Sequence, residues 1–261
     1  MKIPIFQVDA FTDKIFEGNP AAVCPLDEWL ERNIMQKIAA ENNLSETAFF
    51  IKGEEGYDLR WFTPKMEQEL CGHATLAAAH VLYEHLGFEG EYIRFFTRSG
   101  RLSVKKEDDL YVMNFPSRIP EPADMPDDLM AGLGLENPPV KVLKDMNYLV
   151  LLESSEQVRE LRPNFKVLSR INYAGIICTA PGNNHDFVSR YFSPYAGINE
   201  DPVTGSSHTT LTSFWAKELG KKELTARQVS KRGGTLYCKY LGDRTDVGGK
   251  AKTYLQGEIY L

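Results

Sequence analysis

One glutamate in the sequence stands where a carboxylate could transfer protons. Glu46 lies in the segment Asn-Asn-Leu-Ser-Glu-Thr-Ala-Phe-Phe-Ile, at the start of an apolar run that is typical of a buried strand. Partial burial would disfavour the charged form of this carboxyl and raise its pKa toward neutrality, which suits a general acid/base. A glutamate that begins a strand and faces water is the alternative, because surface glutamates are common.

Two glycine-containing loops could hold an anion. One is Glu-Leu-Cys-Gly-His-Ala at 69–74, and the other is Glu-Asp-Pro-Val-Thr-Gly-Ser-Ser at 200–207. Each precedes a predicted helix, whose N-terminus offers free backbone N–H groups and the positive end of the helix dipole. Gly72 and Gly205 let the backbone approach a ligand closely. We expect the two loops to converge on a substrate carboxylate in a cleft between two halves of the chain; tight helix–strand packing is the alternative role of the glycines.

Polar residues in these loops are further candidates. Asp201 precedes Pro202, where it could line the site, cap the helix or form a turn. His73 directly follows Gly72 at a helix N-terminus, where the dipole disfavours an imidazolium, so we expect a neutral donor for a substrate oxygen. His208, one turn along the second helix, is expected to be structural.

The sequence contains an internal repeat. The segment 60–87 matches 190–220: Arg-Trp-Phe-Thr-Pro corresponds to Arg-Tyr-Phe-Ser-Pro, and Gly72 corresponds to Gly205 at a shift of 133 positions. The final Leu-Gly of each segment keeps the same shift. Several matches in the same order indicate an ancient duplication.

The repeat also bears on Cys71. A pair of thiols, one in each half, could remove and return an α-proton from opposite faces of a carbon. The position that corresponds to Cys71 is Thr204, and a threonine hydroxyl is far too weak an acid to be the second base. Two-thiol racemisation is therefore disfavoured.

Each copy of the repeat predicts a strand, a loop and a helix. The strands Asp-Leu-Arg-Trp-Phe-Thr-Pro and Phe-Val-Ser-Arg-Tyr-Phe-Ser-Pro end at proline. The first helix, Ala-Thr-Leu-Ala-Ala-Ala-His-Val-Leu-Tyr-Glu-His-Leu, is apolar nearly all round, which requires burial on every side, as when a sheet wraps around it. Further strands are predicted at 3–9, 20–25, 46–52, 92–98, 101–106, 110–115, 140–153, 174–180, 225–231, 234–241 and 252–261, and further helices at Trp29–Asn43 and Glu156–Leu161. Three prolines in Pro116–Pro122 predict a linker between two α+β domains, residues 1–116 and 121–261.

Composition limits the possible partners. The formal charge of −6 and the pI near 5.5 argue against nucleic acid or an anionic membrane as the main partner. No apolar run approaches the roughly 20 residues of a membrane helix, and Asp9 interrupts the start before a signal peptide could develop. The scattered cysteines indicate reduced thiols, and the histidine spacing predicts no metal site. We therefore expect a cytoplasmic protein.

Several ordered motifs together resemble the PhzF-like family of isomerases, over nearly the whole chain. The motifs are Phe6–Thr12, Gly18–Val23, Leu44–Phe49, Leu70–Thr75 and Glu200–Ser206. The resemblance implies a diaminopimelate-epimerase-like fold, in which each of two similar domains curls a mixed sheet around a central helix.

The resemblance also implies roles for residues of this chain. It makes Glu46 the general acid/base and places His73 and Asp201 beside the substrate, without a cofactor. The implied substrate-binding set is Ser45, Gly72, His73, Ala74, Asp201, Gly205 and Ser206. Ser207 departs from the family, which usually has alanine there; the extra hydroxyl could alter a contact but removes no catalytic group.

The leading functional hypothesis is an isomerase that moves a proton and a double bond within a small carboxylated metabolite, as a monomer or a homodimer. A Cys71-dependent racemase or dehydratase on the same fold is one alternative, and a non-catalytic metabolite binder is another. The resemblance identifies neither the substrate nor a role in making phenazines.

Overall fold

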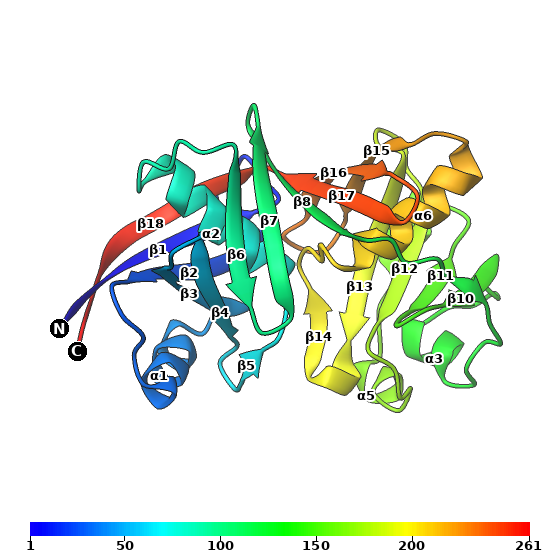
Figure 1. Ribbon diagram of the computed structural model, residues 1–261. Helices are drawn as coiled ribbons and strands as arrows, with labels where there is room; N and C mark the ends of the chain where they lie inside the picture. The colour runs from blue at the N-terminus through cyan, green and yellow to red at the C-terminus, as the bar shows by residue number, and fades with distance from the viewer. The chain divides into compact units, whose positions relative to one another are not determined.

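The computed structural model describes residues 1–261, and the chain divides into two compact units (Figure 1). Unit 1 comprises Met1–Asn114 together with Gly248–Leu261, and unit 2 comprises Phe115–Val247. Both combine a mixed sheet with a few helices, which confirms the α+β class.

Unit 1 is built on a sheet with strand order β18-β1-β2-β3-β4-β6-β7-β8. Its elements are β1 (Lys2–Ala10), β2 (Asn19–Leu26), α1 (Arg32–Asn42), β3 (Glu46–Lys52), β4 (Tyr57–Phe62), β5 (Glu67–Gln68), α2 (Gly72–Glu84), β6 (Tyr92–Thr97), β7 (Gly100–Glu107), β8 (Leu110–Pro116, which passes into unit 2) and β18 (Ala251–Tyr260). The short β5 pairs with β4 beside the sheet.

Unit 2 has the strand order β9-β10-β11-β12-β13-β15-β16, with β14 paired to β13. Its elements are β9 (Glu121–Pro122), α3 (Leu129–Leu133), β10 (Lys141–Lys144), β11 (Tyr148–Leu151), α4 (Ser155–Glu160), α5 (Phe165–Leu168), β12 (Ile176–Pro181), β13 (Phe187–Ser193), the 3₁₀ turn Pro194–Ala196, β14 (Ile198–Asp201), α6 (Ser207–Leu219), β15 (Glu223–Gln228), β16 (Gly234–Tyr240) and β17 (Arg244–Gly249, which returns to unit 1).

The two units repeat one topology. The parallel pair β2–β3 corresponds to the parallel pair β11–β12, and the antiparallel pair β3–β4 corresponds to β12–β13. Parallel β4–β6 likewise corresponds to parallel β13–β15. The predicted duplication therefore extends well beyond the segments in which the sequences match.

The same ion pair recurs in both units. In unit 1, Arg60 Nε lies 2.7 Å from Glu67 Oε1, and its guanidinium lies over the ring of Phe62. In unit 2, Arg190 Nε lies 2.7 Å from Glu200 Oε1, and its guanidinium lies over the ring of Phe192. Each pair ties the loop before the central helix to the preceding strand.

Each unit encloses one helix. Ten consecutive residues of α2, from His73 to Leu82, are buried, and so are ten of α6, from Ser207 to Ala216. The strands β1, β2, β3 and β18 contact α2, and β15 and β16 contact α6. Burial on every side is what the apolar sequence of the first helix predicted, since a helix without a polar face must be covered all round.

The division of the chain differs from the expected ranges 1–116 and 121–261 at its C-terminal end. Strand β18 pairs along its length with β1, from Lys2↔Tyr260 to Ala10↔Ala251, and so belongs to unit 1. The predicted linker is also partly ordered, because β9 pairs with β10. Pairing between the two ends of a chain leaves no local pattern in the sequence.

A second difference lies in the predicted strand 140–153. It forms two strands, β10 and β11, separated by a turn at Asp145–Asn147. Asp145 Oδ1 accepts a hydrogen bond of 2.7 Å from the backbone N–H of Asn147, the local contact by which aspartate initiates turns.

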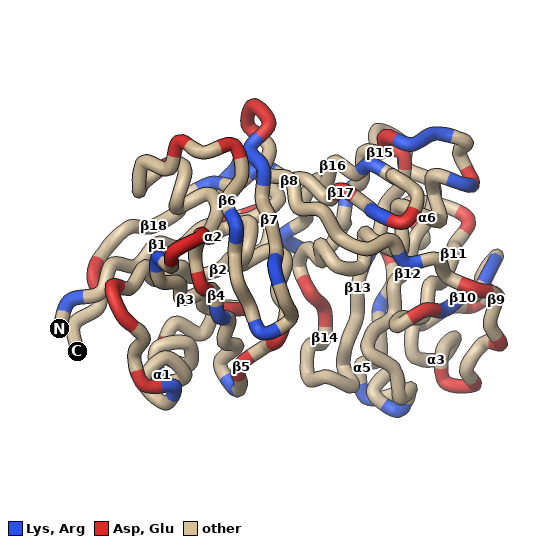
Figure 2. The backbone as a smooth tube through the Cα atoms, in the orientation of Figure 1, with Lys and Arg blue, Asp and Glu red and all other residues tan.

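Basic and acidic residues are interspersed along the backbone of each unit (Figure 2). Helix lengths and hydropathy also leave no helix capable of spanning a bilayer.

A directed chain of hydrogen bonds joins α2 to β18 and β8. Burial lowers the pKa of His80 to about 4, so this ring is neutral. Tyr111 donates its hydroxyl proton to the Glu84 carboxylate (2.9 Å) and must accept from His80 Nδ1 (2.9 Å). His80 Nε2 is then an acceptor for the hydroxyl of Thr253 (2.8 Å), which in turn accepts from His85 Nε2 (2.7 Å).

The Thr253→Val variant should lose about 1–3 kcal/mol of unfolding free energy, because it leaves His80 Nε2 without its donor at a buried position. Thr253→Ser keeps the hydroxyl and should stay closer to wild type. Urea unfolding measures both, and ¹⁵N NMR should show the wild-type His80 protonated on Nδ1 only. A His80 ring protonated on Nε2 would contradict the direction of the chain.

Candidate active site

The predicted acid/base is the first residue of a buried strand. Glu46 begins β3, which runs parallel to β2, and its residue is 9% exposed. His73 Nε2, in the first turn of α2, lies 3.1 Å from Glu46 Oε2. The contact is not aligned as a hydrogen bond, and neither atom has another hydrogen-bond partner. Buried polar atoms are rarely left in this state, and active sites are among the exceptions.

Two further side chains face the other nitrogen of this imidazole. Asn19 Nδ2 lies 3.2 Å from His73 Nδ1, and Cys71 Sγ lies 3.5 Å from it. When the ring is neutral, the Asn19 amide can donate to Nδ1, which leaves the imidazole proton on Nε2, facing Glu46. The segment Gly18–Val23 thus supplies a side chain that orients His73.

The protonation of His73 differs from the expected neutral state. Burial would lower its pKa, but the interactions with Cys71 and Glu46 outweigh burial and raise the pKa well above its usual value. We attribute the direction chiefly to Glu46, because the Cys71 thiol is itself held protonated. The expectation of a neutral ring was wrong because a side-chain charge in contact outweighs the partial charge of a helix end.

Cys71 is a poor thiolate in this setting. Burial raises the pKa of its thiol, and the charge of Glu46 raises it further, against the opposing effects of His73 and the Ala74 backbone N–H. A thiol must ionise to act as a base or nucleophile. The geometry therefore gives Cys71 a packing role beside His73.

Glu46, Cys71 and His73 could together hold a metal ion, since one ligand atom from each lies within 4.8 Å of the others. The sequence spacing had not predicted this set, because the fold brings it together from two separate segments. Carboxylate, thiolate and imidazole are the ligands of Zn²⁺. Both imidazole nitrogens already face side chains, however, so the arrangement suits a proton shared between Glu46 and His73 more directly.

The second group of predicted residues lies in unit 2. The Thr204 hydroxyl donates to Asp201 Oδ2 at 2.6 Å, and Ser206 and Gly205 follow at the N-terminus of α6. His208, within the first turn, is buried, and its pKa falls to about 4 through burial. It is therefore neutral, and its structural role stays a prediction from the sequence.

Unit 2 contains no counterpart of Glu46, for a steric reason. Thr47 pairs with Phe62 as Ile176 pairs with Phe192, so the position before Ile176 corresponds to Glu46. That position is Gly175, and a Cβ there would meet the hydroxyl oxygen of Tyr191 at 2.2 Å. The Tyr191 ring thus fills the space that a side chain at this position would need.

The remaining predicted residues can act mainly through their backbone. Ser45 immediately precedes β3 and is partly buried. Ala74 is fully buried, so only its peptide group can reach a ligand, and Gly72 has no side chain. The predicted site residues therefore form one group in each unit, and the expectation that both groups contact one ligand stays a prediction.

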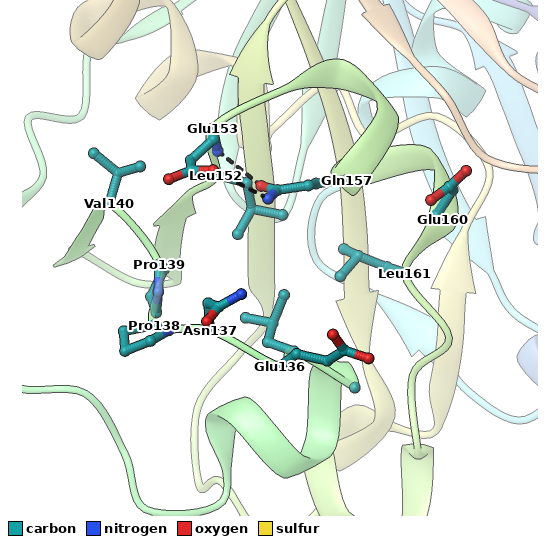
Figure 3. Close-up of a pocket in the computed structure, with 12 residues that line it drawn as sticks. Glu136, Asn137, Pro138, Pro139, Val140, Leu152, Glu153, Gln157, Glu160 and Leu161 are labelled. Carbon is teal, nitrogen blue, oxygen red and sulfur yellow. Dashed lines mark hydrogen bonds between the residues drawn. The ribbon is translucent and has the colours of Figure 1, made fainter.

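A cavity of about 350 Å³ opens elsewhere in unit 2, near α3 and α4 (Figure 3). None of the predicted site residues lines it. Its lining includes Glu136, Glu153 and Glu160, and Gln157 Oε1 accepts a hydrogen bond from the backbone N–H of Glu153. An acidic lining of this kind does not suit a carboxylated ligand.

Two polar residues of these groups were absent from the sequence predictions. Asn19 lies within the motif Gly18–Val23, but no role was predicted for it. Gln228 is fully buried and contacts the Asp201 loop. A signal for Gln228 existed, because Leu224, Ala226 and Gln228 alternate along a strand and share its buried face.

These features define a class of α+β enzyme with two repeated halves and a buried glutamate–histidine pair. Comparison with known proteins supplies the particular family. The family model described as "Phenazine biosynthesis-like protein" matches residues 8–258, and the chain belongs to this PhzF-like isomerase family.

The chain is similar to relatives over its whole length. It is 49% identical to an uncharacterized isomerase of Pseudomonas aeruginosa, over 100% of both chains, and 40% identical to a human phenazine biosynthesis-like domain-containing protein, over 99% of both. A crystal structure of a PhzF-family protein from Enterococcus faecalis has a TM-score of 0.97 and 44% identity, over 100% of both chains.

A more distant likeness concerns the fold alone. A hydroxyproline epimerase from Agrobacterium vitis has a TM-score of 0.64 at 10% identity, over 99% of this chain and 92% of the epimerase. Together with the PhzF structures it confirms the diaminopimelate-epimerase-like fold that the sequence resemblance implied.

His73 should titrate above about pH 6.5, the usual histidine value, in the folded chain. A histidine whose pKa is raised by folding stabilises the folded state. This contribution is complete below the unfolded-state pKa and is lost as pH rises through the folded-state pKa. Glu46→Gln removes the nearby charge and should lower the His73 midpoint. Imidazole ¹⁵N NMR between pH 5 and 9 measures it, with His80 as the internal reference that stays neutral. An unchanged His73 midpoint in the variant would contradict the assigned cause.

Cys71→Ala should cost roughly 1 kcal/mol of unfolding free energy and leave most of the activity, because the thiol is buried and protonated. Cys24→Ala, which removes another buried thiol of unit 1, is the matched control for packing. If Cys71→Ala were as damaging to turnover as a change of Glu46, the thiol-based mechanism would have to be reopened.

Proposed function

We propose that this chain is a cofactor-independent isomerase that moves a proton, and with it a double bond, within a small carboxylated substrate. Glu46 is the general acid/base. The observation that carries the proposal is the state of this carboxylate: it is almost fully buried, and Oε2 lacks a hydrogen-bond partner while lying 3.1 Å from His73 Nε2. Family membership supports the same assignment.

The chemistry requires only a reversible proton transfer. The Glu46 carboxylate removes a proton from a carbon next to an unsaturated system, and the C–H electron pair becomes part of the new double bond. Protonated Glu46 then returns the proton to another carbon on the same face, so no electrons are gained or lost. His73, whose Nε2 lies 3.1 Å from Glu46 Oε2, orients the carboxyl group for both transfers.

Each unit offers backbone N–H donors for substrate oxygens at the N-terminus of its central helix. We propose that the backbone N–H groups at Gly72, Ala74, Gly205 and Ser206 hold them, with Ser45, His73 and Asp201 as neighbouring side chains. Support comes from α2 and α6, each 13 residues long, whose N-termini present such groups with a favourable dipole. A cytoplasmic location and a homodimer stay predictions from the sequence.

The Cys71-dependent alternative has less support. The pKa of the Cys71 thiol is raised, and the Thr204 hydroxyl, at the corresponding position of unit 2, already donates to Asp201. A binder without catalysis would keep the same contacts but would exchange no carbon-bound proton.

Glu46→Gln should reduce carbon–proton exchange at least about a hundredfold while leaving the fold intact, because the amide is nearly isosteric but cannot accept the proton. The measurement is deuterium uptake in heavy water from a panel of unsaturated carboxylic and amino acids, followed by NMR. Glu41→Gln, on the exposed face of α1, is the matched control. Wild-type turnover in the Glu46 variant would end the proposal, and an active panel member would identify the substrate class.

A further inference from the structure

A fully buried glutamine fixes the loop that carries Asp201. Gln228, the last residue of β15, has no solvent exposure. Its Nε2 donates to the Asp201 carbonyl at 2.7 Å, and its Oε1 accepts from the Thr204 backbone N–H at 2.9 Å. One carboxamide thus holds both ends of the turn 201–204, as the edge of a neighbouring strand would.

The same carboxamide reaches the Asp201 side chain through a hydroxyl. Gln228 Nε2 lies 3.3 Å from Thr204 Oγ1, and that hydroxyl donates to Asp201 Oδ2 at 2.6 Å. Since the threonine has a single proton to donate, the amide contact leaves that proton for the carboxylate. The Gln228 carboxamide on β15 therefore sets the orientation of the Asp201 carboxylate through the Thr204 hydroxyl.

One anchor of this loop, a serine hydroxyl, is shared by the two units. Ser230 Oγ donates to the Pro202 carbonyl at 2.7 Å, and Ser99 Oγ donates to the Glu69 carbonyl at 2.5 Å. These carbonyls correspond at the 133-residue shift of the repeat. A serine that follows β6 in unit 1 and β15 in unit 2 therefore anchors the corresponding loop in both copies.

The carboxamide has no such counterpart in unit 1. Two residues before Ser99 stands Thr97, whose hydroxyl donates to the Gly100 carbonyl within its own turn. In unit 1, therefore, Ser99 anchors the loop at the Glu69 carbonyl without help from a side-chain amide at position 97. The amide contact occurs in the copy that carries Asp201.

We propose that Gln228 is a positioning residue that orients Asp201, through Thr204, toward a ligand at the N-terminus of α6. The proposal rests on the proposed function only in so far as Asp201 lines the substrate. Removing the carboxamide should leave the fold of unit 2 but release the Asp201–Thr204 turn, so that ligand binding weakens more than chemistry does.

The test compares Gln228→Met with Gln36→Met in the full chain. Gln36 also donates to a loop carbonyl, that of Thr63, but it lies in unit 1. The probe is sulfate, titrated while the ¹⁵N shifts of the Gly205 and Ser206 amides are followed. We expect the sulfate Kd to rise about tenfold in Gln228→Met, which is about 1.4 kcal/mol, and to stay unchanged in Gln36→Met. The Thr204 amide should also exchange with heavy water at least about tenfold faster in Gln228→Met.

Gln228→Glu supplies a readout that a merely structural role would not give. It keeps the acceptor for the Thr204 N–H but loses the donors at neutral pH, and protonation restores one O–H donor. Sulfate affinity should therefore recover in this variant as pH falls, relative to wild type, but not in Gln228→Met. With any acid that proves active in the heavy-water panel, KM should rise in Gln228→Met and kcat should stay within about threefold.

Equal sulfate affinity in folded wild-type and Gln228→Met proteins would overturn the proposal. The same holds for equal weakening in Gln36→Met, or for wild-type Gly205 and Ser206 amides that do not respond to sulfate. Full exchange activity in Glu46→Gln would instead remove the proposed acid/base. That outcome leaves the sulfate and amide-exchange results unchanged, so the two failures can be told apart.

Discussion

The architecture depends on one constraint: each unit must cover a helix that has no polar face. Ten consecutive buried residues in α2 and ten in α6 leave no side of either helix for water. Polar groups on such helices must find partners inside the protein, because an unsatisfied buried group costs about 1–3 kcal/mol. His80 meets this demand through Tyr111 and Thr253, and His208 Nδ1 donates to the Thr204 carbonyl. His73 meets it through Asn19 and Cys71 at Nδ1, whereas its Nε2 and the facing Glu46 Oε2 have no aligned hydrogen-bond partner.

Duplication provided two equivalent frameworks, and side-chain changes made them different. The Arg–Glu–Phe arrangement before each central helix is retained, as is the serine that anchors each loop. Glu46, however, begins β3 in unit 1, whereas the corresponding position before β12 in unit 2 is Gly175, which Tyr191 covers. The absence of a second carboxylate at this position is therefore a property of packing in unit 2, since the Tyr191 ring fills the space that a side chain would need. The unit without this glutamate contains the Gln228 carboxamide that holds the Asp201 loop.

Local patterns in the sequence predicted the strand of Glu46, the enclosed helices and the glycine loops, since each depends on neighbours within a few residues. The contact between Glu46 and His73 could not be read in this way, because it depends on how α2 docks against β3. The protonation of His73 was missed for the same reason: helix-end reasoning omits charges contributed by other segments. Gln228 carried a recognisable signal, a polar residue on the apolar face of a strand, and the pairing of β18 with β1 carried none. The serine and arginine anchors of the loops were likewise visible only once strand register had been established.

The position of β18 has a consequence for how the chain is made. The ribosome synthesises proteins from the N-terminus, and domains generally fold as they emerge. Unit 2, a continuous segment from Phe115 to Val247, is complete before Ala251–Tyr260 has been synthesised. Unit 1 emerges first, yet until then its β1 lacks its outer neighbour and His80 lacks the Thr253 hydroxyl. The unit that carries Glu46 is thus begun first and finished last, so that a chain truncated before β18 lacks the final strand of that unit.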